Sequence, residues 1–160
     1  MNTKYHNILR YLHAVIAIAL AVFFISKGLD KFGAVKLRDK HIRQENTAAI
    51  VQKIIVEQNY EAPYGYDITM NTMRQSGFMK FIGLFQIIAG ALMFLPQTRM
   101  AGLLLLLPII LNIFLMHVFF DNRAHENIET GRLLGVNIVL LLFYYKELAA
   151  LVWQKKKKFY

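Results

Sequence analysis

The sequence predicts an all-α integral membrane protein: a four-helix bundle with one extramembrane, partly helical segment between its first and second helices. Three observations lead to this fold class. Apolar residues make up 56% of the 160 residues, and the mean hydropathy is +0.37. These residues are concentrated in blocks, which is typical of membrane spans and unusual in a soluble domain of this size. Two of the blocks are separated only by the turn Pro96-Gln97-Thr98-Arg99.

The two central spans are predicted over residues 78–96 and 99–121. After Arg99 the chain reads MAGLLLLLPIILNIFLMHVFF, an almost unbroken apolar run. At ~1.5 Å per residue, about twenty such residues cross the hydrocarbon layer of a bilayer. The short turn between the two runs makes the pair an antiparallel hairpin.

The outer spans are predicted over residues 10–31 and 132–153. The basic start and apolar centre of the first resemble a signal peptide, but no small-residue cleavage site follows, so we interpret it as a retained span. The apolar run of the last span is interrupted by Lys146 before it is long enough to cross a bilayer. The span reaches Trp153 only if Lys146 extends to the surface and Tyr144, Tyr145 and Trp153 lie in the aromatic belt.

The interval 33–78 is the one long polar stretch, and we interpret it as an extramembrane insertion. Ile50, Val51, Ile54 and Ile55 form an apolar stripe at helical spacing. The stripe needs an apolar surface, and the nearest is the outer mouth of the bundle or the membrane surface. A helix that binds a partner protein is the alternative.

The charge pattern indicates a lipid partner. The formal net charge is +9, from 19 Lys+Arg against 10 Asp+Glu, and the basic residues flank the apolar runs. Anionic lipid headgroups explain this placement, and no recognition motif supports nucleic-acid binding. Four spans place both termini on one side, which the basic tail at 155–158 makes the cytoplasmic side.

The absence of cysteine excludes disulfides, iron–sulfur clusters and thiolate zinc sites.

A set of polar residues is predicted to share one depth in the outer leaflet, because each lies at a similar distance from the outer end of its span. Unpaired polar groups are costly in apolar surroundings, so we expect these side chains to face inward. They would either join helices by hydrogen bonds or line a pocket for a quinone headgroup or small solute, gated by Lys27, Asp121 and His125. The candidate ligand-binding residues are Lys27, Gln86, Asn112, His117 and Asn137.

Two histidines lie within predicted spans, and paired histidines in a helix bundle can ligate haem iron. His13 is expected near the inner end of the first span and His117 near the outer end of the third. This separation argues against one haem shared by both, so we expect interfacial or hydrogen-bonded histidines and no metal site.

Several segments resemble one family. Gln86-Ile87-Ile88-Ala89-Gly90, Pro96-Gln97-Thr98-Arg99, Pro108-Ile109-Ile110-Leu111-Asn112-Ile113, His117-Val118-Phe119-Phe120 and Gly28-Leu29-Asp30-Lys31-Phe32 resemble the DoxX-like family of small bacterial membrane proteins. The resemblance implies a compact four-span bundle in the bacterial inner membrane. The family takes its name from the small subunit of a thiosulfate:quinone oxidoreductase, and it supplies no universal catalytic residues. An acidic residue often stands where this chain has Gln86.

Two functions from different classes follow. The first is a non-catalytic subunit or accessory of a membrane redox or respiratory system, with a membrane redox complex or a second copy as partner. The alternative is a protein that binds or transports a small molecule (a quinone, lipid or solute) through the outer-leaflet pocket. We expect no electron transfer by this chain alone, since no redox-active side chain or clear cofactor ligand set is visible. Quinone is the candidate cofactor.

Overall fold

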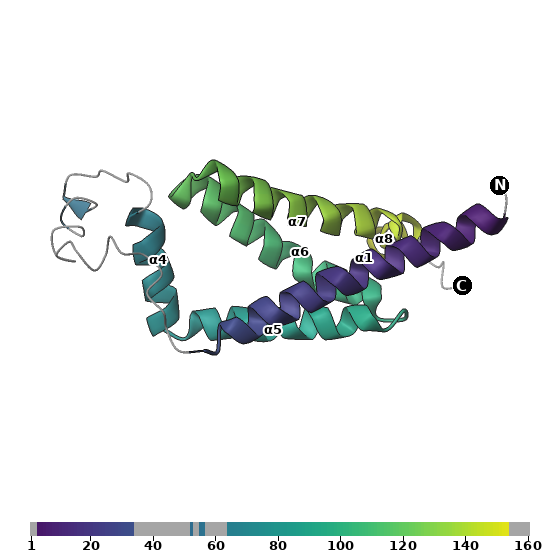
Figure 1. The fold of residues 1–160 in the computed structure, drawn as a ribbon, viewed down its shortest axis with the longest axis horizontal. Helices are drawn as coiled ribbons and strands as arrows, with labels where there is room; N and C mark the ends of the chain where they lie inside the picture. The colour runs from purple at the N-terminus through teal and green to yellow at the C-terminus, as the bar shows by residue number, and fades with distance from the viewer. Residues whose placement is uncertain (1–2, 34–51, 53–54, 57–63, 154–160) are drawn as a thin grey trace, which may run out of the picture.

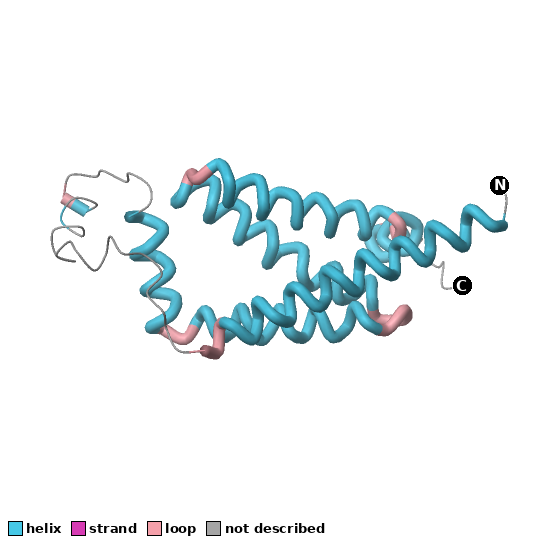
Figure 2. The backbone as a smooth tube through the Cα atoms, in the orientation of Figure 1, coloured by secondary structure: helices cyan, strands magenta, loops and turns pink. Residues whose placement is uncertain are grey.

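The computed structural model of the chain describes residues 3–33, 52, 55–56 and 64–153. All regular secondary structure in these residues is helical, which confirms the all-α fold class (Figure 2). The elements are α1 (Thr3–Asp30), α4 (Tyr64–Gln75), α5 (Phe78–Phe94), α6 (Arg99–Met116), the π-helical turn η1 (His117–Asp121), α7 (Ala124–Leu142) and α8 (Tyr145–Val152).

The long helices form two pairs that are wide apart at one end of the molecule and close together at the other. Helix α1 packs mainly on α5, α5 on α6, and α6 on α7. Figure 1 shows that α4 lies across the wide end, where it contacts α5 and η1. At the narrow end, α1 begins and α8 ends. The four long helices therefore alternate in direction along the chain.

Helices α1 and α5 approach each other through small residues. A Cβ on Gly28 would lie 2.7 Å from the carbonyl oxygen of Gly83, and a Cβ on Gly90 would lie 2.9 Å from that of Ala21. The same device joins α5 to α6, where a Cβ on Gly102 would lie 2.6 Å from the Ala89 oxygen. Small residues allow backbones to approach closely, as they do in membrane helix pairs.

The turn between α5 and α6 is closed by side chains. Arg99 is buried, and its Nε donates a hydrogen bond to the Met93 carbonyl at 3.0 Å. The Thr98 hydroxyl donates to the Leu92 carbonyl at 2.7 Å. Both acceptors belong to the last turn of α5, whose carbonyls have no helical partner. These two residues therefore terminate α5 and fix the start of α6.

The core lies where α1, α5, α6 and α7 meet, and the outside of the helices is rich in exposed large apolar side chains. Two helical stretches, Asn7–Asp30 and Arg99–Asp121, are long and apolar enough to cross a membrane. The number rises to four if each of two bent helix pairs is one span. The core cluster consists of Ala17, Leu20, Ala21, Phe24, Ala89, Met93, Leu103, Leu106, Ile110, Leu140 and Leu141.

Two helix pairs are sharply bent, and the second bend departs from the straight fourth span that the sequence suggests. Helix α4 meets α5 at 81°, and α7 meets α8 at 79°. The fourth predicted span, 132–153, is thus divided at Phe143–Tyr144, and its helix begins eight residues earlier, at Ala124. The last part of the 33–78 interval is helical, because it contains α4. Ile50, Val51 and Ile54 of the predicted apolar stripe lie outside the described residues.

Candidate functional site

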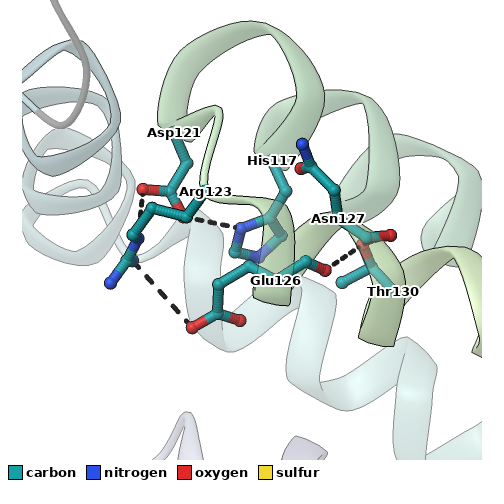
Figure 3. A network of polar contacts seen from close by, with 6 residues as sticks. All are labelled: His117, Asp121, Arg123, Glu126, Asn127 and Thr130. Carbon is teal, nitrogen blue, oxygen red and sulfur yellow. Dashed lines mark hydrogen bonds and ion pairs between the residues drawn. The ribbon is translucent and has the colours of Figure 1, made fainter.

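The densest polar network that the structure describes lies at the wide end of the bundle, where α6 passes into η1. The Asp121 side chain is fully buried and accepts hydrogen bonds from two side chains, those of His117 and Arg123. Its Oδ2 lies 3.0 Å from His117 Nδ1, and its Oδ1 lies 2.6 Å from Arg123 Nε (Figure 3). A buried carboxylate is costly unless it is paired and hydrogen-bonded. Here both of its oxygens are paired.

The π-helical turn shapes this network. The N–H of Asn122 donates to the His117 carbonyl at 2.7 Å, which closes a wider turn than an α-helix makes. Asn122 then takes φ 49°, a left-handed conformation that asparagine tolerates well. This ends the helix and brings Arg123 back over Asp121. Single π-helical turns are frequent at functional sites.

The pairing with Asp121 fixes the chemistry of His117. An ionised carboxylate only accepts hydrogen bonds, so Nδ1 carries a proton. Nε2 is then an acceptor when the ring is neutral and a donor when it is protonated. No hydrogen bond to Nε2 is found among the described residues. A histidine oriented by a carboxylate in this way can exchange a proton with a bound group.

An aromatic ring covers the histidine. The Tyr66 ring of α4 lies 5.0 Å from the His117 ring, between centroids, at an interplanar angle of 33°. Helix α4 is therefore held against η1 at the site itself. His117 remains 8% exposed, so the ring is enclosed without being sealed.

The first turns of α7 complete the network. Arg123 also approaches Glu126, with 4.0 Å between the guanidinium and the carboxylate oxygen. The Thr130 hydroxyl donates to the Glu126 carbonyl at 2.7 Å, and the nearby Asn127 Oδ1 is buried without a hydrogen-bond partner (Figure 3). Buried polar oxygens without a donor are uncommon in proteins and call for an explanation.

Three of the five candidate ligand-binding residues face the interior, as expected. Gln86 is 1% exposed and Asn137 is fully buried. Asn137 donates from Nδ2 to the Leu103 carbonyl at 3.2 Å and so joins α7 to α6. Its Oδ1 and the Oε1 of Gln86 both lack a hydrogen-bond partner. With His117, these residues come from α5, α7 and η1. The expectation that they share one depth is wrong, because Asn137 bonds Leu103 near the start of α6 and His117 follows its other end.

The other two candidates do not face inward, and for them that expectation is wrong. Asn112 lies on an exposed face of α6. Lys27 is also exposed, with its Nζ 5.6 Å from the centre of the Phe23 ring. The reason is helical phase. Asn112 follows buried Ile110 by two residues, which places it about 200° around a helix of 3.6 residues per turn. Ligand binding by the remaining residues stays a prediction.

Of the proposed gating residues, Asp121 is at the centre of the network, whereas His125 lies on the outer surface of α7. His125 Nε2 pairs with Glu129 Oε1 at 3.1 Å. Together with Glu126 they are the one group of three potential metal ligands in the described part of the chain, with ligand atoms within 4.8 Å of one another. His125 and Glu129 are exposed and satisfy each other, so we assign no metal to them.

Lys31 lies partly buried just beyond the end of α1. Its Nζ donates to the Lys27 carbonyl at 3.2 Å. Burial is the main reason that the pKa of Lys31 is lowered, the charge of Lys27 lowers it further, and Asp30 opposes both. The positive charge of Lys27 therefore disfavours the protonated form of Lys31.

The narrow end contains a polar contact that the sequence did not specify. His13 is buried, and its Nε2 lies 3.2 Å from the Leu140 carbonyl of α7. Its ring also packs against Phe143 and Tyr144, with centroids 5.0 and 5.3 Å away. A groove of about 400 Å³, lined almost entirely by apolar side chains, runs between α1 and α7 beside it. His13 and His117 thus lie at opposite ends of the bundle and make separate contacts.

Sequence reasoning missed the roles of Tyr66, Arg99 and Arg123. A signal existed for Arg123, because a basic residue two positions after a carboxylate at a helix end is placed to pair with it. No local pattern shows that Tyr66 meets His117 across 51 positions of the chain. No protein-family model, curated protein or solved structure matches this chain.

Proposed function

We propose that this chain is a DoxX-like protein of the bacterial inner membrane that crosses the bilayer four times, with both termini in the cytoplasm. Helices α1, α5, α6 and α7 are the spans, and α4 and α8 lie across the two membrane surfaces. The alternating helix directions and the exposed apolar side chains support this arrangement. The near right-angle bends support the surface positions of the short helices.

Within that membrane, we propose that the chain serves a redox or respiratory system as a non-catalytic subunit that holds a quinone headgroup. The observation that carries this function is the buried His117–Asp121 pair under the Tyr66 ring. A quinone ring is flat and carries two carbonyl oxygens. It would stack on an aromatic side chain, and one carbonyl oxygen would accept a hydrogen bond from His117 when Nε2 carries a proton.

The chemistry of the chain's own residues is limited to binding and proton handling. Asp121 orients His117 through Nδ1, which leaves Nε2 as the ring nitrogen placed to meet a carbonyl oxygen. Arg123 holds the carboxylate of Asp121 in place. A bound quinone would supply the electron-accepting chemistry.

The quinone proposal is tested by measuring the affinity of the purified full chain for a soluble short-chain quinone. We expect His117→Gln to weaken binding about tenfold, the equivalent of one hydrogen bond. His125→Gln is the matched control, since His125 also pairs with a carboxylate but lies on the surface. Equal affinities of the His117→Gln variant and the unmodified chain would rule the site out.

The subunit proposal has its own test. Affinity purification from native membranes in a mild detergent, without cross-linking, should recover a redox protein in stoichiometric amount. Recovery of the chain without one would reject the subunit role and leave the quinone site as a separate question.

A second candidate function is small-solute binding or transport through the interior. It is favoured by the buried oxygens of Gln86, Asn127 and Asn137, each of which lacks a hydrogen-bond partner and can accept a hydrogen bond. If this function is correct, Gln86→Leu lowers bound-ligand content without lowering thermal stability. A fall in stability alone would assign Gln86 to helix packing.

A further inference from the structure

Helix α6 presents a continuous apolar seam on the side opposite its buried face. Its buried residues include Leu103, Leu106 and Ile110, which pack in the core. The seam on the other side consists of Ala101, Leu105, Pro108, Asn112 and Leu115. Leu105 is half-buried and the other four are exposed.

The spacing within this seam is that of a heptad repeat. Successive members are separated by four, three, four and three residues. Apolar residues repeating every 3.5 positions form the contact line between two supercoiled helices. Helix α6 uses its other face for α5 and α7. Of the five seam residues, Leu105 packs partly against the core, and the four exposed ones are not part of the core cluster.

Asn112 is the polar member of the seam. It lies nine residues before Asp121 and thirteen after Arg99, so about 14 and 20 Å of helix separate it from the two ends of the apolar run. Unlike a lysine, an asparagine side chain is too short to extend from that depth to the membrane surface. An amide left against lipid is costly, and it has no hydrogen bond to any residue that the structure describes.

We propose that the seam is the interface of a homodimer, in which α6 of one copy packs along α6 of another and the two Asn112 side chains meet at the two-fold axis. All copies of a membrane protein insert with the same orientation, so the two α6 helices run parallel. A two-fold axis along the membrane normal then places each seam residue opposite itself. The amide both donates and accepts, so two Asn112 side chains satisfy each other.

The self-pairing of Asn112 is what identifies a second copy as the partner. A single asparagine in an otherwise apolar heptad seam also fixes the register, because any shift leaves both amides unpaired. The Asn112 pair therefore determines the register of the two α6 helices as well as strengthening the dimer.

The absence of cysteine from the sequence allows a clean cross-linking scan in native membranes. Single cysteines at Leu105, Asn112 and Leu115 should form disulfide-linked dimers under mild oxidation, because seam residues near the axis come within disulfide distance. Ile138 and Val139, exposed apolar residues of α7, are the matched controls and should not. Equal cross-linking at all positions, or a linked product whose mass is not twice that of the chain, would overturn the proposal.

A second measurement keeps every seam residue except Asn112. In sedimentation of the purified chain in detergent, Asn112→Leu should weaken dimerisation about 3- to 30-fold, the range found for interhelical side-chain hydrogen bonds. Asn112→Gln should retain most of the affinity, and the thermal stability of the monomer should not fall, because Asn112 is exposed. An unchanged dimer in Asn112→Leu, or a monomeric unmodified chain at all concentrations, would refute it.

Discussion

Gly28 and Gly83 lie against each other where α1 crosses α5, and a Cβ on either would lie 2.7 Å from the carbonyl oxygen of the other. The obstacle on each side is backbone, which cannot rotate away as a side chain can. The contact therefore requires glycine at both positions. It sets the distance between the two helices that form the longest packed pair in the bundle.

Substitution of Gly83 by alanine should destabilise the fold. The added methyl forces α1 and α5 apart, and overpacking of this kind costs about 1–3 kcal/mol, against a gain of up to about 1 kcal/mol in helix propensity. Gly135→Ala is the control: nothing lies within 4 Å of its Cβ position, so it should be neutral or stabilising. The midpoint of thermal unfolding in detergent measures both, and equal shifts would show that the close contact has no energetic role.

Replacement of His13 by alanine should loosen the narrow end of the bundle. The Leu140 carbonyl would lose its hydrogen bond while staying largely buried, which costs about 1–3 kcal/mol. His13→Gln, which keeps a donor, should recover part of the loss. His125→Ala changes a histidine whose side chain is 76% exposed and should leave the unfolding midpoint unchanged. A similar effect of both alanine variants would argue against the α1–α7 bond.

Arg99→Met should lower stability by about 1–2 kcal/mol, since it removes the donor to the Met93 carbonyl and leaves the last turn of α5 less well capped. Lys80→Met serves as the control because Lys80 is an exposed cation near the other end of the same helix. Unfolding in denaturant monitors the change. If Lys80→Met lowers stability as much as Arg99→Met does, the effect comes from removing a positive charge and not from removing the hydrogen bond that caps α5.

The four-span topology predicts opposite accessibility for Gln97 and His125. Gln97 lies in the α5–α6 turn and His125 in the first turn of α7, at the two ends of α6. A cysteine replacing Gln97 should react with an impermeant thiol reagent only after the cells are opened, and one replacing His125 should react in intact cells. Labelling of both from one side would eliminate the topology.

The positions of the central helices could be predicted from sequence because their boundaries carry clear signals. The predicted starts at residues 78 and 99 agree with those of α5 and α6. In both cases a polar or turn-forming stretch meets a long apolar run. The polar stretch Asp121–Arg132 separates the predicted third and fourth spans, yet most of it forms the first turns of α7. Polarity indicates exposure to water, and an exposed segment can still be helical.

The facing of side chains was harder to predict than the helices themselves. Helix α6 is apolar on all sides, so its sequence contains no periodic signal that distinguishes the core face from the outer face. Gln86, His117 and Asn137 were placed correctly toward the interior, whereas Asn112 was not. The contacts of Tyr66 with His117 and of His13 with Leu140 join distant parts of the chain, which depends on tertiary packing alone.

The bends that turn α4 and α8 out of line also decide what kind of membrane suits this protein. In the proposed four-span arrangement, with α4 across the surface, α5 would offer only its 17 residues, about 25 Å, to the lipid, whereas α1 has 28 residues, about 42 Å. One bilayer could not match both lengths, so α1 would tilt or project and the acyl chains beside α5 would be compressed. On the four-span arrangement, short-chain lipids relieve that compression and long-chain lipids increase it. Because of the bends, the thickness of the host bilayer would affect the free energy of unfolding of this protein.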